Sequence, residues 1–218
     1  MDMFDTLAQP VAGDSAQSRV LKNTYTLLAA TLLFTSGVTW VTQDMLMPGW
    51  VYIASMVGSF VLLFATIGLR NSGLGLLALF GFAGLEGLSM GPMIRFYLHA
   101  PGGPATVADA AGLTGIAFLA LSAYVHVTRR DFSAMRGMLF VGLIMVVVAS
   151  IIGIFVPSQA YQMALAGVCA LLFCGYILYD TSAIVLGGET NYIIAAMRLY
   201  LDILNLFQSL LQLLSRRD

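Results

Sequence analysis

Seven apolar runs dominate the sequence, and each is long enough to cross a lipid bilayer. They cover approximately residues 24–41, 49–69, 73–94, 109–127, 137–156, 160–186 and 191–214. A membrane-spanning helix needs about 20 mostly apolar residues, and in hydrocarbon only helices and closed barrels satisfy all of their backbone polar groups. The chain is 59% hydrophobic and 10% charged, whereas soluble domains carry about 25% charged residues. We therefore expect an all-α, polytopic membrane protein with seven transmembrane helices.

Polar or helix-breaking segments separate these runs. The segment His99–Pro104 holds two prolines and two glycines, which predicts a loop with no helical residues. Residues 1–22 are polar, and the first apolar run starts only after Arg19 and Lys22, so we expect no cleavable signal peptide. The sequence predicts a flexible N-terminal tail over residues 1–22 and a single transmembrane domain over residues 23–215.

The distribution of cations predicts the orientation in the membrane. Cytoplasmic loops of membrane proteins carry an excess of Lys and Arg. With the N-terminus in the cytoplasm, the inner side receives seven of the ten cations, namely Arg19, Lys22, Arg70, Arg129, Arg130, Arg136 and Arg198. We therefore expect a cytoplasmic N-terminus and an external C-terminus.

Small residues recur at close spacing in two of the runs. In membranes such faces let helix backbones approach closely. They predict packing faces on the third run (Gly84, Gly87 and Gly91) and on the fourth (Ala108, Gly112 and Gly115).

Two aspartates, Asp180 and Asp202, lie inside the last two runs. A carboxylate at the centre of a membrane helix costs about 2.5–3.5 kcal/mol on insertion scales, so it is retained where it faces protein or water. At about 1.5 Å per residue from the loop Gly187–Thr190, Asp180 lies about 10 Å and Asp202 about 18 Å into their helices. Two carboxyl groups in one dry site cannot both ionise cheaply and therefore titrate as a pair. A shared proton would keep such a site closed, and loss of the proton would open it by repulsion.

The deprotonated pair would also offer hard oxygen ligands to a divalent cation, so Asp180 and Asp202 are candidate residues of a Ca²⁺ path. An alternative is that each aspartate acts alone. Arg198 lies four residues before Asp202, the spacing of an ion pair along one helix face, and Asn205 lies three residues after it.

Glu86 and Arg70 are the other candidate site residues. Glu86, in the middle of the third run, could line the same path as a third acid, pair with an interior arginine, or lie protonated in a packing face. Arg70, at the inner end of the second run, is a candidate counter-ion for Asp180. Alternatively it extends its side chain to the membrane interface, as arginines at helix ends do.

Other chemistry finds little support in the sequence. No HExxH, GxSxG or Walker motif occurs, and His99 and His126 have no candidate ligand cluster around them. Intramembrane aspartyl proteases have Gly-x-Gly-Asp at their second aspartate, where this chain has Leu199-Tyr200-Leu201-Asp202. The ten Lys and Arg residues form no basic stripe, so we expect no nucleic-acid partner. We expect no enzymatic activity and no cofactor, with Ca²⁺ only as a transported ion.

Five segments resemble the Bax inhibitor-1 (transmembrane BAX inhibitor motif) family. Its third, sixth and seventh spans are similar to Gly84–Ile94, Ile177–Ser182 and Leu199–Phe207. Its bacterial YccA-like branch is similar at Gly187–Ile193 and Lys22–Tyr25. All five segments lie within residues 20–215.

The resemblance implies a seven-helix fold in which the last helix is surrounded by the other six. It also implies a pH-sensitive calcium leak controlled by an aspartate pair on spans six and seven, which Asp180 and Asp202 match. An arginine at the inner end of span two partners the pair in the closed state of bacterial calcium-leak members, and Arg70 matches it approximately. Two residues depart from the family pattern: Glu86 stands where an apolar or small residue is more common, and Arg198 is unusual beside the pair.

Two functional hypotheses follow, and they are compatible with each other. The first is a pH-sensitive Ca²⁺ leak channel or exchanger of the bacterial inner membrane, gated by Asp180 and Asp202 and responding to protons. The second is a non-enzymatic modulator of the membrane protease FtsH, because the namesake of the YccA-like branch binds and restrains that protease. The second hypothesis would use the polar N-terminal tail and the helix surfaces.

Overall fold

The computed structural model describes residues 9–45 and 47–215. Over this part of the chain there are seven long helices and a short 3₁₀ helix, η1 (Ser133–Met135), and no strand. The long helices are α1 (Gln9–Thr42), α2 (Gly49–Gly68), α3 (Gly73–Leu98), α4 (Gly103–Thr128), α5 (Arg136–Phe155), α6 (Gln159–Val185) and α7 (Tyr192–Leu214). All seven are long and apolar enough to span a membrane. The all-α, seven-helix fold predicted from the sequence is confirmed.

Helix α1 begins earlier than the predicted tail allows. The predicted tail covered residues 1–22, but residues from Gln9 onward already belong to α1. Pro10 lies in the first turn, where its missing N–H has no intrahelical partner to lose. The predicted tail therefore remains only over residues 1–8, which lie outside the described residues.

Helix α4 also begins earlier than predicted. The expectation that all of His99–Pro104 is non-helical is wrong at Gly103 and Pro104, which form the first turn of α4. Gly102, the N-cap residue, adopts a left-handed conformation with φ of 66°, which glycine adopts without steric cost. A Cβ at Gly103 would collide with the carbonyl oxygen of Tyr97. The two glycines and the N-terminal proline therefore make a tight turn between α3 and α4.

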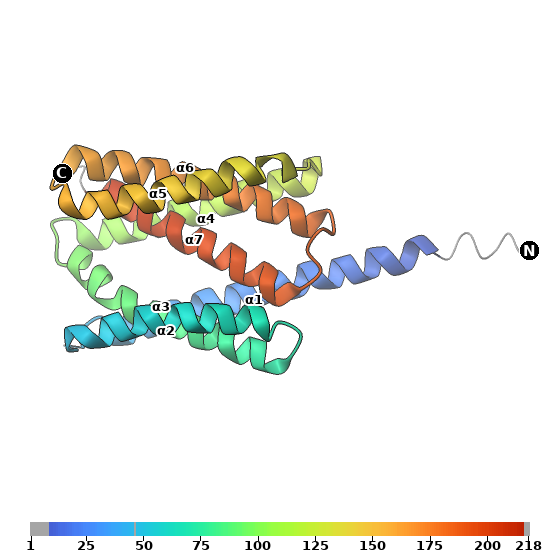
Figure 1. Ribbon diagram of the computed structural model, residues 1–218, viewed down its shortest axis with the longest axis horizontal. Coiled ribbons are helices and arrows are strands. Elements are labelled where there is room, and N and C mark those ends of the chain that lie inside the picture. The colour runs from blue at the N-terminus through green and yellow to red at the C-terminus, as the bar shows by residue number, and fades with distance from the viewer. Residues whose placement is uncertain (1–8, 46, 216–218) are drawn as a thin grey trace, which may run out of the picture.

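Helix α7 is the central helix of the bundle. Helices α1–α3 form one group and α4–α6 form another, and α7 lies between the two groups (Figure 1). It packs against α1, α2, α3, α4 and α6, which agrees with a central last helix. Among the described residues α5 packs only against α6 and η1 and does not reach α7.

The α2–α3, α4–α5 and α6–α7 loops lie at the same end of the bundle as the beginning of α1 (Figure 1). We call this end the Asn191 end. The side-chain amide of Asn191 donates hydrogen bonds to the Arg70 carbonyl oxygen at 3.0 Å and to Asn71 Oδ1 at 2.9 Å. These bonds join the α6–α7 loop to the α2–α3 loop.

Only one of the two predicted small-residue faces packs closely. A Cβ at Gly87 would lie 2.7 Å from the Thr35 carbonyl oxygen, and one at Gly91 would lie 3.0 Å from Thr42 Oγ1, so α3 contacts α1 through this face. Ideal Cβ atoms at Gly112 and Gly115 meet nothing within 4 Å. The prediction for the fourth span is therefore wrong, since these glycines are exposed on α4.

A buried chain of hydrogen bonds joins α7 to both α1 and α3. Thr35 Oγ1 donates to the Ala83 carbonyl oxygen at 2.9 Å, and the Tyr200 hydroxyl lies 2.7 Å from the same Thr35 oxygen. Because Thr35 uses its only hydrogen on Ala83, the Tyr200 hydroxyl must be the donor to Thr35. The Tyr200 ring also packs against Phe82 with centroids 5.6 Å apart.

Candidate functional site

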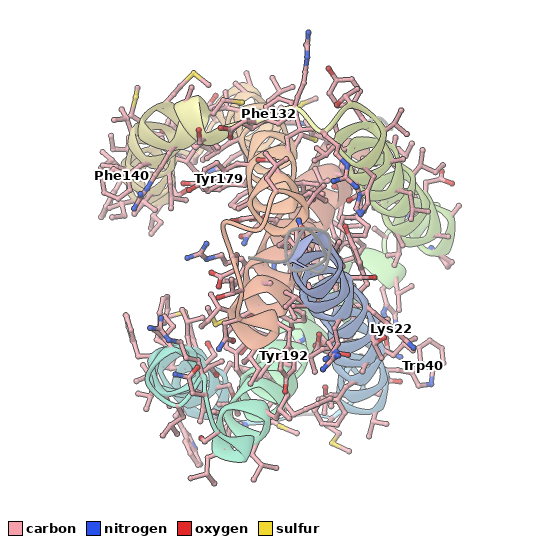
Figure 2. All side chains as sticks on the ribbon, turned by 90° about the vertical axis from the view of Figure 1, so that its right-hand side faces the viewer. Lys22, Trp40, Phe132, Phe140, Tyr179 and Tyr192 are labelled. Carbon is pink, nitrogen blue, oxygen red and sulfur yellow. The ribbon has the colours of Figure 1, made fainter. Side chains whose placement is uncertain are left out.

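A groove with a volume of about 1020 Å³ runs between the two helix groups, and α7 lines its floor. Residues of α2 and α3 form one wall and residues of α5 and α6 form the other. Figure 2 looks at the bundle from the Asn191 end, with Phe140 of α5 and Tyr179 of α6 beside the opening. The polar residues that line it are Ser59, Glu86, Arg136, Tyr176, Tyr179, Asp180, Arg198, Asp202, Asn205 and Gln208.

Asp180 and Asp202 meet in this groove. Asp180 lies near the end of α6 and Asp202 lies on α7, and each is 5% exposed. Both side chains line the groove from adjacent helices, and two carboxyl groups can hydrogen-bond to each other only when one of them is protonated. Asp202 Oδ2 is buried and has no hydrogen-bond partner among the described residues. The structure thus brings together the two residues that the sequence singled out as a pair.

Arg198 binds the acids of α6 and of the α6–α7 loop. Its Nη1 lies 3.6 Å from Asp180 Oδ1 and 3.7 Å from Glu189 Oε2. The alternative in which Arg198 pairs with Asp202 along one helix face is not realised among the described ion pairs. Arg198 crosses instead to the neighbouring helix, where it supplies a positive charge beside the aspartate pair.

Arg70 lies elsewhere. It is an exposed residue of the turn after α2, and its guanidinium makes no ion pair with any described residue. The Arg70 carbonyl oxygen accepts a hydrogen bond from Asn191 at the end of the bundle. The counter-ion of Asp180 is Arg198 and not Arg70. A gating role of Arg70 remains a prediction.

Glu86 lines the same groove from α3. It is half-buried and shares the groove with Ser59 of α2, whose hydroxyl donates to the Met56 carbonyl oxygen at 2.9 Å. It forms no ion pair with an arginine in the described part of the chain. Of the three alternatives for Glu86, its position in the groove agrees with a third acid beside Asp180 and Asp202.

Asn205 and Gln208 continue the polar floor along α7. The Asn205 amide donates to the Leu201 carbonyl oxygen at 2.7 Å. Sequence reasoning missed Gln208, although a signal was present: Arg198, Asp202, Asn205 and Gln208 follow at spacings of four, three and three, which is one face of a helix. Arg136, Tyr176 and Tyr179 were also missed as groove residues, and only the packing of α5 and α6 reveals them.

The groove offers few ligands for a resident metal ion. No group of three or more His, Cys, Asp or Glu residues that could hold a metal ion occurs in the part of the chain that was searched. Ca²⁺ takes six to eight oxygen ligands in a stable site, and the aspartate pair supplies only part of that number.

Comparison with known proteins identifies the family. Residues 17–218 match the family model described as "Inhibitor of apoptosis-promoting Bax1". An uncharacterized membrane protein of Vibrio cholerae is 46% identical over 198 residues, with 90% of this chain and 89% of the relative covered. The "Modulator of FtsH protease YccA" of Escherichia coli is 38% identical over 196 residues, with 90% and 89% covered. An Escherichia coli relative with the same identity and coverage is named "Inner membrane protein YccA". The chain therefore belongs to the Bax inhibitor-1 family and is a YccA-like member of it.

Proposed function

We propose that this protein modulates a membrane protease of the FtsH type. The observation that carries the proposal is its 38% identity over 196 residues to a protein named as a modulator of FtsH. The identity covers 90% of this chain and 89% of that relative. The names of relatives also favour an inner-membrane location.

The Asn191 end offers a surface for such a partner. The Gln17 side-chain amide of α1 donates to the Val185 carbonyl oxygen of α6, and Asn191 binds the α2–α3 turn. The beginning of α1 and two loops are thereby held together as one polar surface. The distribution of cations in the sequence predicts that this surface faces the cytoplasm.

Asn191→Ala tests this surface. Asn191 caps α7 through hydrogen bonds from the backbone N–H groups of Ile193 and Ile194, so the change also removes a helix cap, which costs about 1 kcal/mol. Ser158→Ala is the matched control, because Ser158 caps α6 at the opposite end of the bundle. We expect Asn191→Ala to reduce both co-purification with FtsH and protection of FtsH substrates, and Ser158→Ala to reduce neither. Absence of co-purification with the unaltered protein would refute the proposal.

A second candidate function is a proton-controlled Ca²⁺ leak through the groove. The observation that favours it is that Asp180 and Asp202, each 5% exposed, line the same groove from adjacent helices. Arg198, Arg136, Glu86 and the loop residue Glu189 are the other charged groups near the pair or in the same groove. A shared proton holds α6 and α7 together, and its loss at higher pH leaves two carboxylates that repel each other. We expect flux to rise as the proton is lost.

The test is Ca²⁺ flux into liposomes as a function of pH. Changing both aspartates to asparagine keeps a neutral, hydrogen-bonding pair that cannot titrate, so we expect the pH dependence to disappear. Asp109→Asn is the control, because Asp109 is an exposed carboxylate on α4 outside the groove. The same pH response in the double variant and in the unaltered protein would exclude the leak. That result would leave the protease proposal intact.

A further inference from the structure

The groove opens sideways, in the direction of the membrane. Helices α2 and α5 form its two edges and make no contact with each other among the described residues. Figure 2 shows this opening between Phe140 of α5 and the α2–α3 pair. Phe60 and Met56 on the α2 edge are 57% and 55% exposed, and Phe140 on the α5 edge is 61% exposed. In a bilayer these side chains meet the lipid.

The walls of this opening change from charged to apolar along its length, whereas Glu86, Asp202 and Asn205 keep its floor polar. Arg136 is the first residue of α5 and lies at the Asn191 end, where Arg198 reaches the same groove. Farther along, the walls carry Phe60 and Leu63 on one side and Phe140 and Leu143 on the other. An occupant therefore needs a polar, anionic end and an apolar body.

Arg136 supplies the charge that an occupant would meet. It is exposed and forms no ion pair with any residue that the structure describes. Arg198 already faces Asp180 and Glu189 and offers only part of its charge. Arginine binds phosphate oxygens through two parallel N–H groups, and basic pockets between membrane helices on the cytoplasmic side bind phospholipid head groups.

A protein helix fits the groove less well than a lipid chain does. A helix with its side chains is about 10–12 Å wide, so its passage through about 30 Å of hydrocarbon fills about 2400–3400 Å³. The groove holds about 1020 Å³, so most of such a helix would lie outside it. An acyl chain is narrower and flexible enough to follow the apolar walls.

We propose that an anionic phospholipid occupies this groove from the side, with its phosphate on Arg136 and one acyl chain between Phe60 of α2 and Phe140 of α5. The lipid then covers the polar floor and separates the aspartate pair from the bilayer interior. Its binding requires neither the protease nor Ca²⁺. The proposal is therefore tested separately from both functions above.

Quenching of tryptophan fluorescence by brominated lipid tests the proposal. The full-length protein, with Trp40 and Trp50 changed to Phe, receives one reporter: Phe140→Trp in the groove or Met138→Trp on α5. Met138 has nearly the same depth, is 64% exposed and does not line the groove. Each protein is reconstituted in phosphatidylcholine containing a fixed fraction of brominated phosphatidylglycerol or of brominated phosphatidylcholine.

We expect brominated phosphatidylglycerol to quench the Phe140→Trp reporter more strongly than brominated phosphatidylcholine does, and both lipids to quench the Met138→Trp reporter equally. Adding Arg136→Gln should lower the preference at the groove about fivefold, since one cation near an anionic surface contributes about 1 kcal/mol. Arg130→Gln, a cation of the same end that does not line the groove, should leave the preference unchanged. Equal quenching by the two lipids at both reporters would overturn the proposal. An unchanged preference in Arg136→Gln, with helix content intact by circular dichroism, would overturn the assignment of the phosphate to Arg136.

Discussion

The hydrogen bonds that join α7 to α1 and α3 predict that Tyr200→Phe destabilises the unaltered protein and stabilises a Thr35→Val variant. The Tyr200 hydroxyl donates to Thr35, and Thr35 donates to the Ala83 carbonyl oxygen. Tyr200→Phe removes one interhelical hydrogen bond, which in membrane proteins averages about 0.6 kcal/mol and reaches about 1.7 kcal/mol. We expect this variant to lower the free energy of unfolding by about 1 kcal/mol.

Thr35→Val should cost more than Tyr200→Phe. It removes both hydrogen bonds and leaves the Tyr200 hydroxyl, on a residue with no exposed surface, without an acceptor. A buried unsatisfied hydroxyl costs about 1–3 kcal/mol, so the total loss is about 2–3 kcal/mol. In the Thr35→Val background, Tyr200→Phe removes this unsatisfied group and should raise the free energy of unfolding by about 1 kcal/mol. The same substitution therefore destabilises one background and stabilises the other.

The assay is unfolding in mixed micelles with increasing sodium dodecyl sulfate, followed by circular dichroism for the four members of the cycle. Tyr161→Phe is the control: the Tyr161 hydroxyl donates to the Ala149 carbonyl oxygen at 2.7 Å and shares no partner with Thr35. Its effect should be the same in both backgrounds. If Tyr200→Phe destabilises both backgrounds equally, Thr35 and Tyr200 are not coupled, and the hydrogen bond between them makes no net contribution to stability.

Three further predictions rest on the same fold. Gly87→Ala should lower the free energy of unfolding by about 1–3 kcal/mol, because its Cβ would meet the Thr35 carbonyl oxygen at 2.7 Å. Gly112→Ala, with open space around it, should raise the free energy of unfolding by up to about 1 kcal/mol. The unfolding midpoints of the two variants check this, and equal effects would contradict it. Arg198→Met should destabilise the protein by about 1 kcal/mol near neutral pH. This value is low because the Arg198 side chain is 43% exposed, and solvent weakens exposed ion pairs. The deficit should shrink as the pH is lowered, because a protonated Asp180 needs no cation, and a deficit independent of pH would argue against the Arg198–Asp180 ion pair. Gly103→Ala should strongly destabilise the protein, since a Cβ in this first turn of α4 would collide with the Tyr97 carbonyl oxygen. Thermal aggregation of the purified variant measures this, and Gly73→Ala, at the first residue of α3 with nothing within 4 Å, is the control.

Much of the fold follows from hydrophobic length alone. Seven runs of sufficient length produced seven spanning helices, because the bilayer permits little else. The predicted helix ends were wrong where one residue type was interpreted without its position in the helix. Pro104 was taken to exclude a helix, although proline is favoured in a first turn, and the polar residues before Arg19 were taken as a tail although a helix continues through them.

The candidate site was predictable in its acids but not in its cation. Asp180 and Asp202 are conspicuous because charges are rare in apolar runs. The partner of Asp180 depends on which side chain crosses between helices, and no spacing within one helix reports that. Arg198 therefore looked like a local partner of Asp202, and Arg70 like a distant partner of Asp180, before the packing of α6 and α7 placed Arg198 beside Asp180 and Glu189.

The central position of α7 has a consequence for biosynthesis. Membrane helices are made in chain order, so α1–α6 leave the ribosome before the helix that lies between their two groups. Until α7 inserts, Asp180 lacks both Asp202 and Arg198, and the walls of the later groove have no floor. Helices α1–α3 and α4–α6 must therefore either stay separated until α7 inserts, or associate and then separate again. Newly made chains that lack α7 would present an unpaired intramembrane carboxylate, a feature by which quality-control machinery in the membrane could recognise an unfinished molecule.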